Sequence, residues 1–102
     1  MSIAFPRPKN YPYENVFYHD GNVALIWGRY KKSQHMSLGM RWTESESPLG
    51  YPNIFGNGMW MVVPDNIACF ILKGISSNSK ESCNILEPQI LTEALVELES
   101  RC

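Results

Sequence analysis

The sequence predicts an α+β fold in which an antiparallel four-stranded sheet, a three-strand meander plus a fourth strand, carries two C-terminal helices. Short apolar runs separated by turn signals fill the first two thirds of the 102-residue chain, which is typical of strands. Helix-like apolar runs follow in the last third. The length fits one domain, residues 1–102.

Residues 1–15 contain three prolines, at positions 6, 8 and 12. Proline cannot donate the hydrogen bonds that join strands, so this segment is expected to be an extended arm. Asp20-Gly21-Asn22 is a tight-turn signal between two apolar runs. It predicts a hairpin with strands at about residues 15–19 and 22–31.

The middle of the second strand is apolar on both faces, with Leu25 and Trp27 on one side and Ala24 and Ile26 on the other. This strand is therefore predicted to be central in the sheet. A third strand is expected over about residues 36–42. One of its faces is apolar and the other is expected to meet solvent; the solvent-facing set is Ser37, Gly39 and Arg41. Gly28 and Gly39 are expected at bulges or at close approaches by another group.

A long loop is expected over residues 43–58, followed by a fourth strand at about 59–63. Pro64 should end this strand, because it cannot continue the hydrogen-bond ladder.

The first helix is predicted over about residues 66–73, with Asp65 as its N-cap and Gly74 as its stop. Because this segment is apolar almost all round, it is expected to be largely buried.

Residues 76–84 form a polar linker, and the last helix is predicted over about 87–100, with Pro88 in its first turn. Its core-facing residues recur with helical spacing; they are Leu91, Ala94, Leu95 and Leu98. Its acidic residues fall outside that stripe; they are Glu93, Glu97 and Glu99.

Charge is distributed unevenly, although the net charge of the chain is only −1. Residues 1–51 carry six Lys/Arg and four Asp/Glu, a net of +2, whereas residues 52–102 carry three and six, a net of −3. The overall charge therefore gives no drive toward nucleic acid or an anionic membrane, and the acidic C-terminal half favours a basic partner.

The three cysteines, Cys69, Cys83 and Cys102, are an odd number without Cys-x-x-Cys spacing. They predict no disulfide framework and a reducing cytoplasmic location. His19 and His35 lack metal-ligand spacing to a cysteine, so no metal is expected. No cofactor is expected, and no apolar run reaches the length of a membrane span.

Motifs of nucleophilic catalysis are missing from the sequence, and the glycine-rich segment 56–58 precedes a strand rather than a helix. The chain is therefore predicted not to be an enzyme. A small metal-free ribonuclease stays open as a third hypothesis, because suitable acid, base and cationic groups exist; they are His19, Arg29, His35, Arg41 and Glu44.

A second hypothesis is a regulator that binds single-stranded nucleic acid. Basic residues interleaved with aromatic residues on a sheet can hold bases by stacking and phosphates by charge. The candidate residues lie in the second and third strands and the turn between them; they are Arg29, Lys31, Lys32, Arg41 and Trp42.

Two segments, LGMRW and SPLGYPNIFGNGMWMVVPDNIACFIL, carry a resemblance that covers about residues 36–73. This part of the chain resembles a recurring set of short, free-standing bacterial proteins. In size and style the chain is similar to the immunity proteins of bacterial toxin systems, including contact-dependent inhibition. The resemblance implies a small cytoplasmic protein that binds a toxin.

The leading hypothesis is therefore a non-enzymatic protein-binding module, an immunity protein that blocks the active site of a nuclease-type toxin. Carboxylates and aromatic side chains would cover a basic substrate cleft. The candidate contacts lie in the long loop and on the last helix; they are Glu44, Glu46, Tyr51, Phe55, Glu93, Glu97 and Glu99.

Overall fold

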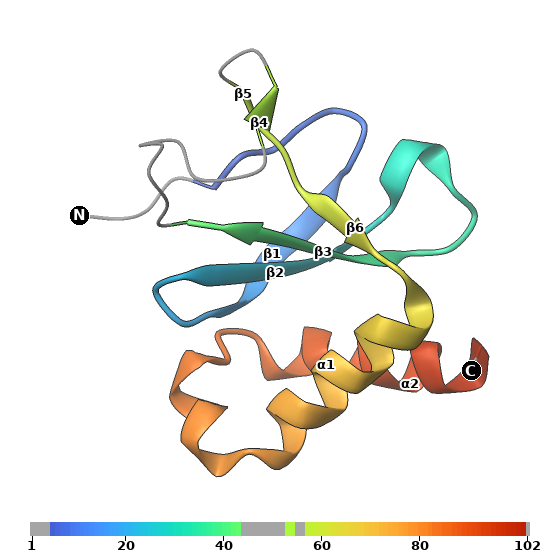
Figure 1. Ribbon diagram of the computed structural model, residues 1–102. Coiled ribbons are helices and arrows are strands. Elements are labelled where there is room, and N and C mark those ends of the chain that lie inside the picture. The colour runs from blue at the N-terminus through green and yellow to red at the C-terminus, as the bar shows by residue number, and fades with distance from the viewer. Residues whose placement is uncertain (1–4, 44–52, 55–56, 102) are drawn as a thin grey trace.

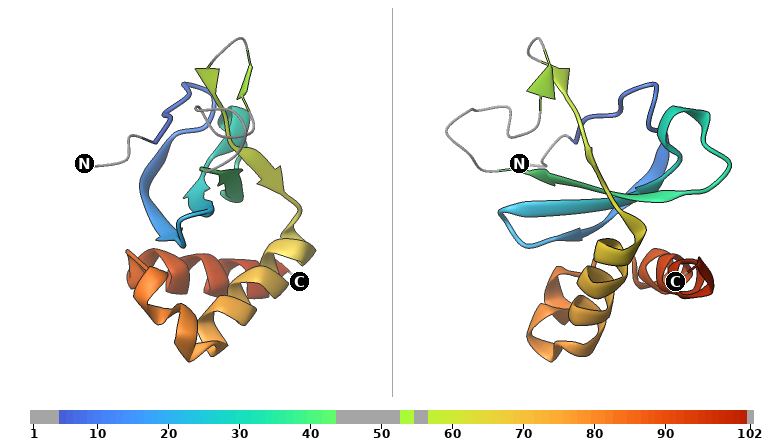
Figure 2. Two further views of the ribbon diagram at one scale, coloured as in Figure 1. Left: turned by 60° about the vertical axis from the view of Figure 1, so that its left-hand side comes forward. Right: turned by 45° about the vertical axis from the view of Figure 1, so that its right-hand side comes forward.

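The computed structural model describes residues 5–43, 53–54 and 57–101 of the chain. It confirms the predicted α+β class, since an antiparallel four-stranded sheet is followed by two C-terminal helices. The sheet has the order β1-β2-β3-β6, with strands β1 Tyr13–His19, β2 Val23–Gly28, β3 Ser37–Trp42 and β6 Met61–Val63. The helices α1 (Asp65–Ser77) and α2 (Pro88–Arg101) lie together against one face of that sheet (Figure 1, Figure 2).

The β1–β2 turn forms where the sequence predicts it, and β2 is central in the sheet. The carboxylate of Asp20 accepts hydrogen bonds from the backbone N–H groups of Asn22 and Val23, at 2.9 and 2.8 Å. Gly21 has a φ of +95°, a conformation that a residue with a Cβ adopts only at a cost. The turn is therefore fixed by one acceptor side chain and one glycine.

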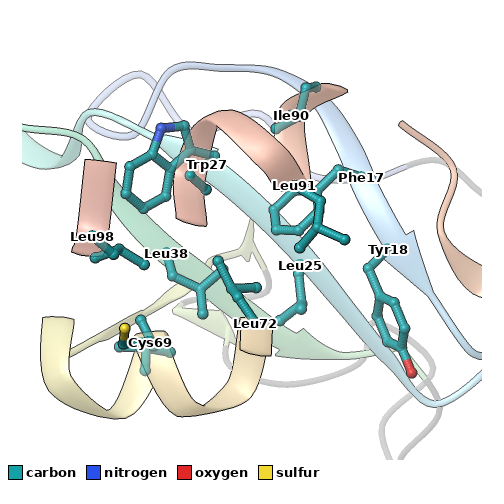
Figure 3. Packing of buried hydrophobic residues seen from close by; sticks show 13 residues of the cluster. Phe17, Tyr18, Leu25, Trp27, Leu38, Cys69, Leu72, Ile90, Leu91 and Leu98 are labelled. Carbon is teal, nitrogen blue, oxygen red and sulfur yellow. The ribbon is translucent and has the colours of Figure 1, made fainter. Parts of the chain in front are cut away.

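The main hydrophobic cluster fills the space between the sheet and the helices. Figure 3 shows side chains from β1, β2, β3, α1 and α2 directed into it. Its largest fully buried members are Phe17, Leu25, Leu38, Leu72 and Leu98. Burying each of these side chains contributes about 1.5–3 kcal/mol, so this cluster supplies most of the driving force that holds the helices on the sheet.

The opposite face of the sheet is also covered. The prediction that one side of β3 faces solvent is therefore wrong. Tyr11 of the N-terminal arm is 1% exposed and donates a hydrogen bond to the carbonyl of Ser37, with an oxygen–oxygen distance of 3.0 Å. Gly39 is buried, and Arg41 is only 2% exposed. The arm and Trp60 build a second hydrophobic cluster on this face, so the fold has a thin third layer of aromatic residues.

The arm also explains why β2 ends at Gly28 and not near residue 31 as predicted. A Cβ on Gly28 would lie 2.5 Å from the carbonyl oxygen of Pro12, so the arm approaches the strand at this glycine. The backbone N–H of Arg29 donates to that carbonyl, and the N–H of Lys31 donates to Asn10. The chain therefore leaves β2 to follow the arm and forms the short 3-10 helix Tyr30–Lys32.

The limits of α1 differ from the prediction at both ends. Pro64 is the N-cap, with the N–H of Ala68 donating to its carbonyl, and Asp65 is already the first helical residue. Gly74 does not stop the helix, which continues to Ser77. Ile75 lies beyond the glycine and packs against the main cluster, and this contact offsets the roughly 1 kcal/mol that a helical glycine costs.

The prediction that this helix is largely buried is also wrong. Ala68, Cys69 and Leu72 face the core, but the side opposite them is open, with Phe70 76% exposed and Ile67 49% exposed. One sheet face can cover only one side of a helix, and the apolar residues on the other side of α1 meet solvent.

Shorter elements complete the described chain. The predicted long loop contains the two-stranded pair β4 (Asn53–Ile54) and β5 (Asn57–Gly58), and β6 begins two residues later than expected. A 3-10 helix, Ser79–Asn84, occupies the predicted polar linker. The last helix, predicted over about residues 87–100 with Pro88 in its first turn, runs from Pro88 to Arg101. In the described part of the chain, none of the helices combines the length and the apolar character that crossing a bilayer requires.

Candidate functional site

Of the predicted acidic contacts on the last helix, Glu93 and Glu97 lie on the same side of α2, whereas Glu99 lies on another side. Glu93 and Glu99 are exposed and Glu97 is half-buried, while Leu91, Ala94 and Leu98 of the same helix are buried in the core. The other predicted contacts, Glu44, Glu46, Tyr51 and Phe55, lie outside the described residues. The candidate site is therefore built from α2 and its neighbours.

A groove of about 570 Å³ lies along this surface. Helix α2 forms one side of it, and Met36, which precedes β3, adds apolar surface from the sheet side. Trp27 of β2 also borders the groove but is only 3% exposed. Its lining residues are Trp27, Met36, Thr92, Glu93, Val96, Glu97 and Ser100. Two of the predicted carboxylates thus border a hollow with an apolar component, which is a better binding geometry than an isolated charged face.

Helical spacing places the α2 part of the groove on one side of the helix. Positions 92, 96 and 100 are each four residues apart, and Glu93 and Glu97 form a parallel row one residue along. Glu99 lies outside this set and does not line the groove. Glu93 and Glu99 are therefore equally charged residues of one helix, of which only Glu93 borders the hollow.

Arg101, at the end of α2, connects the groove to the rest of the fold. Its guanidinium donates to Glu97 at 2.8 Å, to the carbonyl of Met36 at 2.9 Å, and to the carboxylate of Asp65 at 3.3–3.4 Å. It also lies over Trp27, with 5.7 Å between the guanidinium carbon and the ring centre. Partial burial opposes its charge, but Glu97 and Asp65 hold the pKa of Arg101 above its ordinary value.

The predicted nucleic-acid residues are not brought together. Strand register pairs Gly28 with Ser37 at one end of the β2–β3 ladder and Val23 with Trp42 at the other. Arg29, Lys31 and Lys32 therefore lie beyond the first end, whereas Trp42 lies at the opposite end.

Arg41, another of the predicted nucleic-acid-binding residues, is buried. It lies on the arm side of the sheet, where it donates to the carbonyl of Met59 and its guanidinium carbon lies 5.8 Å from the centre of the Trp60 ring. Burial lowers its pKa, and the nearby Tyr13 acts in the opposite direction. Arg41 is thus a structural residue of the second hydrophobic cluster.

The two histidines lie apart as well. His19 ends β1, where its Nε2 lies 3.0 Å from the hydroxyl of Thr43 and its ring contacts Phe5 edge-on at 5.3 Å. His35 is exposed in the turn that precedes β3, at the other end of the sheet. Glu44, the carboxylate of the ribonuclease hypothesis, lies outside the described residues. Within the described ranges, no cluster of three metal-ligating side chains occurs.

Two other hollows lie along the N-terminal arm. One, of about 390 Å³, includes Arg7 and Glu87, and the other, of about 590 Å³, includes Arg7 and Lys9. The guanidinium of Arg7 already donates to the carbonyls of Tyr13 and Glu14 and lies over the Tyr13 ring. Arg7 therefore serves to hold the arm against β1.

Sequence reasoning missed Trp27, Met36, Val96 and Arg101 as parts of the site. The Glu97–Arg101 pair carries a readable signal, since residues four apart on a helix are neighbours and a basic residue suits the last turn. The contribution of Trp27 has no such signal, because it depends on how α2 packs against the sheet.

Comparisons with known proteins add no further constraint. No protein-family model matches the chain, and neither the curated proteins nor the solved structures include a match. The functional argument therefore depends on the geometry of the groove and on the charge around it.

Proposed function

We propose that this protein is a non-enzymatic protein-binding module that receives a basic surface of a partner on α2. The observation that carries the proposal is the groove in which Glu93 and Glu97 border a hollow whose exposed apolar surface comes from Val96 and Met36. Such a site offers a partner both desolvated contact area and complementary charge, the two elements that binding interfaces combine.

The class of partner that fits best is a nuclease-type toxin, with this chain as its immunity protein in the cytosol. A nuclease needs a positively charged cleft to hold phosphates, and an acidic helix placed against that cleft would exclude the substrate. The uneven charge of the chain supports the direction of this pairing, since residues 52–102 carry a net of −3.

Co-expression with the neighbouring reading frames tests the proposal. Each adjacent frame is expressed in a bacterial host alone and together with this chain, and growth is recorded. We expect one frame to arrest growth alone and to be neutralised by this chain. The charge-reversal variant Glu93→Lys should lose neutralisation, whereas Glu99→Lys, on the same helix but outside the groove, should keep it. Toxicity from no adjacent frame, or equal loss in both variants, would contradict the proposal.

A second candidate, binding of single-stranded nucleic acid, keeps one supporting observation. The arm runs beside the turn after β2, where the N–H of Lys31 donates to the carbonyl of Asn10. Exposed cationic side chains therefore gather at this end of the sheet; they are Lys9, Arg29, Lys31 and Lys32. Fluorescence polarisation with a labelled oligonucleotide separates the two functions. If three phosphates are contacted, the logarithm of the binding constant should fall with the logarithm of the salt concentration with a slope of about −2. Absence of binding at low salt would exclude this function.

A further inference from the structure

The groove beside α2 already shows which positive group its surroundings accept, because Arg101 of the same chain lies at its end. The side chain of Arg101 is only 17% exposed, and its guanidinium lies over Trp27 and donates to Glu97. A guanidinium suits this environment because it is planar, stacks on indole rings and is less strongly hydrated than an ammonium group. The indole and the carboxylate that hold Arg101 also line the open groove.

Negative charge remains in the groove beyond the carboxylate oxygen that pairs with Arg101. Glu93 lies one turn before Glu97 on the same side of α2, and it has no hydrogen bond or ion pair within the described part of the chain. Glu97 contributes one carboxylate oxygen to Arg101. The exposed side chain of Val96 lies between the two glutamates in sequence and adds apolar surface to the lining.

We infer that the groove is the receptor for one arginine side chain of the partner protein. Its aliphatic part would pack on Val96 and Met36, and its guanidinium would lie between Glu93 and the Trp27 side of the groove. The volume of about 570 Å³ falls within the range of roughly 300–1,000 Å³ that is typical of pockets for compact ligands. The inference rests on the proposed function in one respect, which is that the arginine belongs to a protein.

Three short peptides test the chemistry directly without knowledge of the partner. The probes are acetylated and amidated Gly-Arg-Gly, Gly-Lys-Gly and Gly-citrulline-Gly, titrated into the ¹⁵N-labelled full chain and followed by NMR. Citrulline keeps the shape of arginine but has no charge. We expect the arginine peptide to shift the indole N–H signal of Trp27 and the amide signals of Glu93 and Glu97. Lysine should bind more weakly, and citrulline should produce no saturable shift.

Two matched variants locate the binding site. Glu93→Gln should weaken arginine-peptide binding about three- to fivefold, the value of a solvent-accessible charge pair. Glu99→Gln removes the same charge from the same helix outside the groove and should leave the affinity unchanged. Both residues are exposed and neither contributes to the core, so both variants should fold. Equal weakening in the two variants, or equal binding of arginine and citrulline, would overturn the inference.

The remaining outcomes distinguish this inference from the proposed function. Signal shifts at the groove on raising the protein concentration alone would identify a second copy as its occupant and overturn the inference. Neutralisation of a toxin without arginine-peptide binding would overturn the inference and leave the proposed function standing. Arginine-peptide binding without any neutralised toxin would support the inference for the groove and remove the immunity function.

Discussion

The guanidinium carbon of Arg101 lies 5.7 Å from the centre of the Trp27 ring, so the last turn of α2 is joined to the central strand of the sheet. The same guanidinium donates to the carbonyl of Met36 and forms ion pairs with Asp65 and Glu97. One side chain therefore links the start of β3, the start of α1 and the end of α2. Two of these three parts, Met36 at the start of β3 and helix α2, also line the candidate groove.

The first prediction concerns this link. Arg101→Gln should lower the free energy of unfolding by about 1–2 kcal/mol, because it removes charge-assisted hydrogen bonds at a side chain that is only 17% exposed. Urea unfolding followed by circular dichroism measures the change. Lys73→Gln is the control, since the exposed side chain of Lys73 makes no ion pair in the described residues, and it should change stability by less than about 0.5 kcal/mol. Equal effects of the two variants would show that Arg101 does not join the elements.

The second prediction uses two glycines that the sequence alone does not distinguish. Gly74→Ala should stabilise the protein by about 0.5–1 kcal/mol, because Gly74 lies inside α1 and an added Cβ would meet nothing within 4 Å. Gly21→Ala should destabilise it by about 1 kcal/mol or more, because the φ of +95° at Gly21 strains any residue with a Cβ. Thermal unfolding of both variants measures these opposite signs. A stabilising Gly21→Ala would contradict the described turn.

The third prediction separates the two sides of α1. Leu72 is fully buried between the helix and the sheet, so Leu72→Ala should cost about 2–5 kcal/mol through lost burial and the cavity left behind. Phe70, two residues earlier, is 76% exposed, and Phe70→Ser should change stability by less than about 0.5 kcal/mol. Chemical denaturation of the pair gives the comparison. A large loss in Phe70→Ser would mean that another surface covers this side of the helix.

The pairing of the strands was predictable from local signals, and the burial of their faces was not. The turn at Asp20 and Gly21 and the two apolar faces of β2 are properties of neighbouring residues, so they can be read from the sequence. The environment of the buried Arg41 includes Tyr13 and Trp60, which are 28 and 19 residues away from it in the sequence. An alternating pattern predicts two faces for a strand, but it does not say that an arm will return to cover the second one.

Local signals also do not predict the extent of α1 or the part of the candidate site that tertiary packing creates. Gly74 carries a stop signal, but α1 continues past it to Ser77, and Ile75 beyond the glycine packs against the main cluster. The acidic face of α2 was predicted, because Glu93 and Glu97 lie on the same helix as a clear core stripe. The apolar surface that the sheet side adds to the groove comes from Met36 beside the nearly buried Trp27, and only tertiary packing places these residues next to α2.

The last prediction is a pH dependence that arises from the β1–β2 turn. The carboxylate of Asp20 accepts hydrogen bonds from the N–H groups of Val23 and Asn22 and from the hydroxyl of Tyr18. Partial desolvation acts in the opposite direction, but these donors hold the pKa of Asp20 below its ordinary value of 3.8. A carboxyl group whose pKa is depressed by folding stabilises the protein fully above the ordinary value, and the contribution is lost as the pH falls through the folded value.

Asp20→Asn tests this pH dependence, since the amide keeps an acceptor oxygen but has no charge to titrate. The difference in unfolding free energy between the wild-type chain and this variant should be constant from pH 7 to about pH 5. It should then shrink below about pH 4, because the wild-type carboxylate becomes protonated. Glu14→Gln, at an exposed site on β1, is the control and should show no such change. Urea unfolding at a series of pH values measures both, and a difference that stays constant down to pH 2 would mean that the Asp20 charge does not stabilise the turn.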